Sequence, residues 1–181
     1  MTKVVLVNAL TLSRVPLSLM FCTTILLTAN PFWPCIALFA LVAVSDYLDG
    51  KLARMHGVQT GIGAMLDVIT DFFFIIAACL SLFSRGLFPL WMLAVIVFKF
   101  LEFWITSAVF TKGGKSVTVF LFDPFGRIMA VLFYLLPVLA LLLPLCFPIT
   151  ARQIALGIIC TGTAILAVVS STFRIASLVK K

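Results

Sequence analysis

The sequence predicts an all-α membrane protein: a bundle of six transmembrane helices with both termini in the cytoplasm. Its composition is 64% hydrophobic and only 10% charged, with a mean hydropathy of +1.28, whereas soluble domains are about half apolar and a quarter charged. The apolar residues form long runs, and the basic residues gather at alternate ends of these runs. Such a chain cannot hydrate its surface as a soluble monomer, which excludes soluble enzymes, disordered proteins and free nucleic-acid-binding domains.

Six apolar stretches are each close to the roughly 20 residues that a helix needs to cross a bilayer. They are Thr11–Ala29, Pro34–Arg54, Thr60–Phe83, Leu87–Phe110, Pro124–Pro148 and Ile154–Leu178. Helix-breaking residues separate them: Asn30-Pro31 with Pro34, then Gly57, Arg85-Gly86, Gly113-Gly114 and Thr150. Asp123 is expected to cap the fifth helix, with Pro124 in its first turn. No internal repeat is visible, so residues 1–181 are expected to form one domain.

The distribution of Lys and Arg predicts the orientation, because cytoplasmic loops are enriched in these residues. With a cytoplasmic N-terminus and alternating helices, ten of them fall on the cytoplasmic side: Lys3, Arg14, Lys51, Arg54, Lys112, Lys115, Arg127, Arg174, Lys180 and Lys181. The opposite side holds Arg85 and Arg152, and Lys99 lies within a span. The net charge of +7 is therefore attributed to topology and contact with anionic lipid, not to nucleic acid.

Four of the six acidic residues lie where the second helix ends and the third begins. Asp46 and Asp49 are three residues apart, and Asp67 and Asp71 are four apart, so each pair occupies one helix face. An antiparallel hairpin turning near Gly57 brings the two pairs to similar depth. Acidic groups at membrane depth are costly and usually face a cavity or a partner.

These four carboxylates repel one another unless they are neutralised. Divalent cations with oxygen ligands (magnesium, manganese or calcium) are the favoured explanation. Two alternatives stay open at this point: pairing with the nearby bases Lys51, Arg54 and His56, or a proton relay in a carboxylate-lined ion or proton transporter.

The same segment resembles a known family. The residues Asp46, Asp49, Gly50, Ala53, Arg54, Gly63, Asp67 and Asp71 match the CDP-alcohol phosphotransferase signature D-x2-D-G-x2-A-R-x8-G-x3-D-x3-D at every specified position. The six-span outline is also similar to that family. The resemblance implies an enzyme that transfers a phosphatidyl group from CDP-diacylglycerol to a small polar alcohol and releases CMP.

The resemblance also implies the cofactors and the assembly. Asp46, Asp49 and Asp67 are expected to hold metal, and Asp71 to contribute to a second ion and to take the proton of the attacking hydroxyl. Two Mg²⁺ or Mn²⁺ ions then flank the pyrophosphate and stabilise the leaving group. The family's members are dimers with the active site near the cytoplasmic face, so a homodimer is expected.

The resemblance places six residues at the CDP-lipid: Thr11, Arg14, Gly50, Ala53, Arg54 and Thr60. Thr11 and Arg14 belong to Asn8-Ala-Leu-Thr11-Leu-Ser-Arg14, which resembles the family's N-x-x-T-x-x-R element. Gly50 lacks a side chain, so cytidine can approach its backbone closely, and Arg54 is suited to phosphate. Thr60 is equally well explained as a helix N-cap, and Gly63 as a helix-packing residue.

The acceptor is expected to bind a basic group formed by Lys112, Lys115, Arg127 and Arg174, although each also fits the positive-inside pattern. Inositol, inositol phosphate and glycerol phosphate are the candidates. Phe72 follows Asp71 where phosphatidylglycerophosphate synthases are expected to carry Lys, and Gly126-Arg127-Ile-Met-Ala replaces their later G-K-x-K-T stretch. The run from Gly63 to Asp71 looks closer to phosphatidylinositol-type synthases. Lys99 and Glu102 are expected to form a buried ion pair or else a polar wall of the acceptor cavity.

Overall fold

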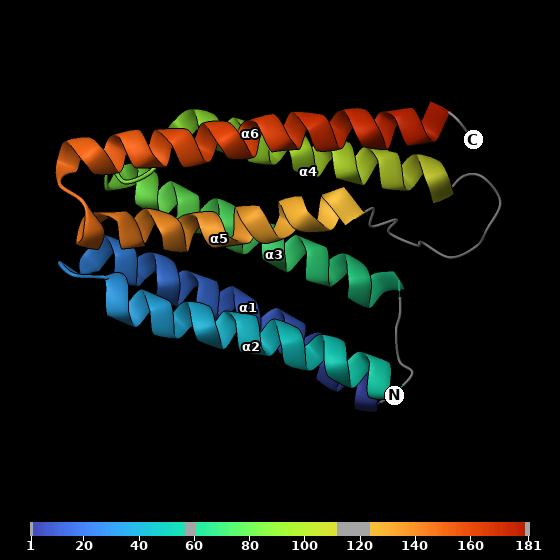
Figure 1. The fold of residues 1–181 in the computed structure, drawn as a ribbon. Coiled ribbons are helices and arrows are strands. Elements are labelled where there is room, and N and C mark those ends of the chain that lie inside the picture. The colour runs from blue at the N-terminus through green and yellow to red at the C-terminus, as the bar shows by residue number, and fades with distance from the viewer. Residues whose placement is uncertain (1, 57–60, 112–123, 180–181) are drawn as a thin grey trace. The chain divides into compact units, whose positions relative to one another are not determined.

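The structure is a computed structural model that describes residues 2–56, 61–111 and 124–179. Within these ranges the chain forms helices and no strands, which confirms the all-α class. The helices are α1 (Thr2–Leu27), α2 (Phe32–His56), α3 (Gly61–Ser84), α4 (Leu90–Thr111), α5 (Pro124–Cys146) and α6 (Ile149–Val179), in the order shown in Figure 1.

Five helical segments are long and apolar enough to cross a bilayer. They are Phe32–Leu52, Met65–Ser84, Leu90–Ser107, Phe125–Cys146 and Ile149–Ala176. The apolar part of α1, Thr11–Leu27, is shorter. The sixth span and the cytoplasmic position of the termini therefore stay predictions.

The helices differ from the apolar stretches mainly at their ends. α1 begins at Thr2 rather than Thr11 and so includes the apolar run Val4–Val7, which Asn8 separates from the predicted stretch. α6 begins at Ile149, so the predicted break at Thr150 is wrong: Thr150 lies in the first turn, where the Arg152 amide donates to the Pro148 carbonyl at 3.0 Å. The break at Arg85-Gly86 is confirmed, and Gly86 has a φ of 67°, which glycine adopts without strain.

The chain divides into two compact units, Met1–Arg85 and Gly86–Lys181. In the first unit α1 packs against both α2 and α3. Phe21 of α1 meets Phe74 of α3 edge-on with ring centroids 5.3 Å apart, and Phe39 of α2 lies 6.1 Å from Phe74. These rings tie the three helices together about two turns along α1 from Arg14.

In the second unit α6 packs against both α4 and α5. The buried apolar side chains of this unit include Met92 and Ile96 of α4, Leu136 and Ala140 of α5, and Ala167 of α6. Phe125 near the start of α5 stacks on Phe173 of α6, with centroids 5.1 Å apart and ring planes 6° apart. Polar side chains also join α4 to α6.

Arg85 caps the C-terminus of α1, although the sequence suggests only a topological role for it. Its Nε donates to the Ile25 carbonyl at 2.8 Å, and its Nη2 donates to the Thr28 carbonyl at 2.5 Å. The last carbonyls of a helix lack intrahelical partners and carry the negative end of the helix dipole. Arg85 therefore stabilises this helix end by hydrogen bonds as well as by charge.

We expect Arg85→Ala to cost about 1 kcal/mol of stability, the usual range for a cation at a helix C-terminus. This corresponds to a fall in Tm of about 2–4 °C for a chain of this size. Thermal unfolding in detergent measures it. Arg152→Ala is the matched control, because no hydrogen bond of the Arg152 side chain is found among the described residues. Equal Tm values for the two variants would contradict the capping role.

Candidate functional site

Three of the four aspartates converge. Asp46 of α2 and Asp67 and Asp71 of α3 each offer a carboxylate oxygen, and these oxygens lie within 4.8 Å of one another. The side chain of Asp49 lies outside the described part of the structure. The spacing predicted that acidic faces of α2 and α3 meet, and the three described aspartates do so. The roles of these residues stay predictions.

Arg14 of α1 lies at the centre of this acidic cluster (Asp46, Asp67 and Asp71). Its Nη1 contacts Asp71 Oδ1 at 2.5 Å and Asp46 Oδ1 at 3.1 Å, and its Nη2 contacts Asp67 Oδ1. The Arg14 side chain is fully buried, whereas the three carboxylates are 33% to 47% exposed. The guanidinium therefore lies on the buried side of the acidic cluster, and the three carboxylates remain partly exposed to solvent.

Sequence reasoning missed this pairing. The sequence offers Lys51, Arg54 and His56 as the nearby bases, and the family resemblance places Arg14 at the CDP-lipid. The available signal was positional: Arg14 lies at the predicted cytoplasmic end of its helix, at the membrane face where the acids lie. Thr11 lies one turn before Arg14 and is also buried, so both residues of the N-terminal element occupy one face of α1.

Short polar contacts fix the backbone around the cluster. The Ser18 hydroxyl donates to the Arg14 carbonyl at 2.6 Å, and the Thr70 hydroxyl donates to the Asp67 carbonyl at 2.9 Å. Ser13 and Ser45, which directly precede Arg14 and Asp46, share a hydrogen bond of 3.4 Å between α1 and α2. Of these contacts, only the one between Ser13 and Ser45 crosses between helices, and it helps to hold the register in which Arg14 meets Asp46.

The acidic cluster fits a divalent cation. Its members offer only oxygen, the donor that Mg²⁺ and Mn²⁺ prefer, and their separation lets them share one ion. Among the described residues, one guanidinium charge faces three carboxylate charges, a balance that favours a cation.

Among the described residues, no packing contact requires glycine at position 50. A Cβ built on it meets no described atom within 4 Å. The open space beside its backbone agrees with the predicted close approach of a ligand at this position. Of the other residues predicted to bind the CDP-lipid, Thr60 and the side chains of Ala53 and Arg54 lie outside the described part of the structure.

The predicted acceptor residues have different surroundings. Lys112 and Lys115 lie outside the described residues. Arg127, near the start of α5, is exposed. Arg174 of α6 is only 6% exposed and is held by side chains of α4. The predicted Lys99–Glu102 ion pair is confirmed, with a distance of 2.8 Å and both side chains 9% exposed.

Comparison with known proteins identifies the family. A family model described as CDP-alcohol phosphatidyltransferase matches residues 4–172. This chain belongs to the CDP-alcohol phosphatidyltransferase family. The match extends over both compact units and includes the acidic cluster, so membership favours a transferase over the ion or proton transporter.

Individual relatives match over shorter stretches. The chain is 40% identical over 65 residues to a cardiolipin synthase (CMP-forming) of Streptomyces coelicolor, which is 36% of this chain and 30% of that protein. It is 33% identical over 85 residues to a CDP-diacylglycerol–glycerol-3-phosphate 3-phosphatidyltransferase of Cereibacter sphaeroides, 46% of this chain and 38% of the relative. A Bacillus subtilis protein of that same name is 32% identical over 82 residues, covering 45% and 42% of the two chains. Each match spans less than half of the relative.

Proposed function

We propose that this protein transfers a phosphatidyl group from CDP-diacylglycerol to glycerol phosphate and releases CMP. The convergence of Asp46, Asp67 and Asp71 around Arg14 supports this proposal most directly, because it gives the family's signature a cation-attracting geometry. Glycerol phosphate is favoured over inositol or inositol phosphate because two of the relatives are named for it. Phe72 and the stretch at Gly126-Arg127 depart from the pattern expected of phosphatidylglycerophosphate synthases, and the run from Gly63 to Asp71 looks closer to phosphatidylinositol-type synthases. The acceptor therefore requires a direct test.

In the proposed reaction, the acceptor hydroxyl oxygen attacks the lipid-side phosphorus of the CDP-lipid. The bond from this phosphorus to the bridging oxygen breaks, and CMP leaves with that oxygen. A carboxylate oxygen of Asp71 takes the hydroxyl proton. Asp46, Asp49 and Asp67 hold the divalent cations, which offset the pyrophosphate charge when bound. Arg54 pairs with phosphate, and Arg127 and Arg174, together with Lys112 and Lys115, bind the acceptor phosphate.

CMP release from CDP-diacylglycerol in detergent tests this function. The purified protein is assayed with glycerol 3-phosphate, inositol and inositol phosphate, each with and without Mg²⁺ or Mn²⁺. We expect release that depends on both glycerol phosphate and the metal. CMP release with an inositol acceptor alone would change the assigned acceptor. Absence of CMP release with every acceptor would overturn the proposal.

Gly50 offers a test that separates binding from folding. Alanine is favoured over glycine within a helix by about 0.5–1 kcal/mol, and the described surroundings leave space for the methyl group. We therefore expect Gly50→Ala to keep or raise Tm while it raises the KM for CDP-diacylglycerol. Gly157→Ala is the matched control, because Gly157 also lies in a helix with open space around it. An unchanged KM in Gly50→Ala would contradict contact with the nucleotide.

The proposed orientation, with a cytoplasmic active site and termini, predicts a labelling pattern. In a cysteine-free background, Ser84→Cys and Arg152→Cys should react with an impermeant reagent added outside intact cells. Lys51→Cys, Lys115→Cys and Lys181→Cys should react only after permeabilisation. The opposite pattern would reverse the orientation derived from the basic residues.

A further inference from the structure

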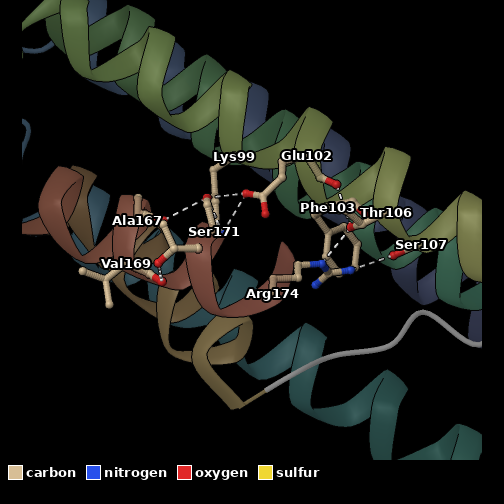
Figure 2. Close-up of polar contacts among 10 residues, drawn as sticks. Lys99, Glu102, Phe103, Thr106, Ser107, Ala167, Val169, Ser171 and Arg174 are labelled. Carbon is tan, nitrogen blue, oxygen red and sulfur yellow. Dashed lines mark hydrogen bonds and ion pairs between the residues drawn. The ribbon is translucent and has the colours of Figure 1, made fainter. Parts of the chain in front are cut away.

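A buried polar seam joins α4 to α6. It consists of Lys99, Glu102, Thr106, Ser107, Ser171 and Arg174 (Figure 2). At one end, Lys99 Nζ donates to Glu102 Oε2 at 2.8 Å and to Ser171 Oγ at 3.0 Å. The Ser171 hydroxyl lies 2.5 Å from Glu102 Oε2 and 3.0 Å from the Ala167 carbonyl, and it donates to one or other of these acceptors.

Arg174 forms the other end of the seam. Its Nε donates to Thr106 Oγ1 at 2.7 Å, and its Nη2 donates to Ser107 Oγ at 3.2 Å. The guanidinium carbon also lies 4.8 Å from the centre of the Phe103 ring, a cation–π distance. Three side chains of α4 therefore determine where the Arg174 guanidinium lies.

The two ends of the seam are coupled. Ser171 and Arg174 are three residues apart on α6 and share one helix face. On α4, the Thr106 hydroxyl that receives the Arg174 hydrogen bond donates in turn to the Glu102 carbonyl at 2.7 Å. A rotation of α6 that breaks the Ser171 contacts therefore also moves Arg174 relative to Thr106 and Ser107.

Charged side chains lie within the apolar helix α4. Lys99 and Glu102 pair at 2.8 Å with both side chains 9% exposed. Glu102 uses Oε2 for its contacts, whereas its buried Oε1 has no hydrogen-bond partner in the described residues. Buried charges within a membrane span are costly and are a mark of function. An ordered guanidinium such as that of Arg174 suits a phosphate group.

We propose that Lys99, Glu102 and Ser171 are positioning residues that fix the rotation of α6 against α4 and thereby aim Arg174 at the acceptor phosphate. This inference rests on the proposed function, in which Arg174 binds that phosphate. Hydrogen-bonded networks in a low-dielectric interior hold a single geometry. Apolar contacts alone hold the rotation of a helix less strictly, because several side-chain packings have similar energies.

Ser171→Ala tests the proposal, with Ser170→Ala as the matched control. Ser170 is the preceding residue of α6, is 1% exposed, and its hydroxyl makes no hydrogen bond to the described residues. We expect Ser171→Ala to raise the KM for glycerol 3-phosphate roughly tenfold, the order expected for misplacing a charge-assisted hydrogen bond. The KM for CDP-diacylglycerol should stay unchanged. Ser170→Ala should change neither constant, and Ser171→Thr, which keeps the hydroxyl, should behave as the wild type.

A double-mutant cycle shows whether Ser171 acts through Arg174. In an Arg174→Ala background, Ser171→Ala should raise the acceptor KM no further. Three results would overturn the positioning role. The two substitutions could raise the acceptor KM additively, Ser171→Ala could raise both KM values in parallel, or Ser171→Ala could behave like Ser170→Ala. If the wild type itself releases no CMP with any acceptor, the proposed function has failed; loss of the Ser171 effect in an active enzyme contradicts only this inference.

Discussion

Asp67→Asn is expected to reduce CMP release by more than about 100-fold, because substitutions of residues that only support a metal ligand already cost 10–100-fold. The substitution keeps the side-chain shape but removes one of the converging charges. Mg²⁺ or Mn²⁺ should raise the Tm of the wild-type protein in detergent, since a ligand of the folded state stabilises it. In Asp67→Asn this shift should disappear. Asp46→Asn and Asp49→Asn should behave in the same way.

Two further variants separate metal binding from pairing with Arg14. Arg14→Met removes the described guanidinium, so it should keep or tighten divalent cation binding if the carboxylates are ligands. If the carboxylates serve only to neutralise Arg14, Arg14→Met and Asp67→Asn should destabilise the protein alike, and metal should shift neither Tm. Ser84→Ala on α3 is the folding control, because its hydroxyl donates to the Ser81 carbonyl in its own helix. Near-normal activity at saturating metal in any two of the three Asp→Asn variants would refute the metal assignment.

Asp71→Asn is expected to reduce the chemical step by about 10²–10⁴, the usual range for loss of a positioned general base. Binding of CDP-lipid should change by less than about tenfold, in contrast to Asp46→Asn. Asp71 is the least exposed of the three described carboxylates, at 33% against 47% for Asp46. It also lies furthest from the start of α3, and the proposed reaction has the acceptor hydroxyl attack there.

Binding of a non-hydrolysable CDP-lipid analogue and single-turnover CMP release, measured on the same Asp71→Asn preparation, distinguish these roles. Unchanged binding with a slow chemical step identifies a base. A parallel collapse of binding and rate would make Asp71 a ligand like the other aspartates, and the base would then be sought elsewhere. A normal single-turnover rate would remove Asp71 from the reaction altogether.

Local features of this protein followed from the sequence. The apolar stretches located the helices to within a few residues, except at the starts of α1 and α6, where Asn8 and Arg152-Gln153 interrupt the apolar sequence inside the helix. The spacing of Asp67 and Asp71 placed them on one face of α3, and the spacing of Lys99 and Glu102 predicted their ion pair. These features depend on residues three or four apart, and the helical repeat fixes the geometry over that distance.

The contacts between helices required the tertiary structure. Arg14 meets Asp67 and Asp71 across 53 and 57 residues, and Ser171 reaches Glu102 across 69. Helical periodicity specifies which residues share a face, but not which face of another helix they meet. In helices that are apolar on nearly every side, hydropathy does not distinguish these faces. The pairing of faces is decided by the packing of many side chains at once, and that packing placed Arg14 among the aspartates and Arg174 against α4.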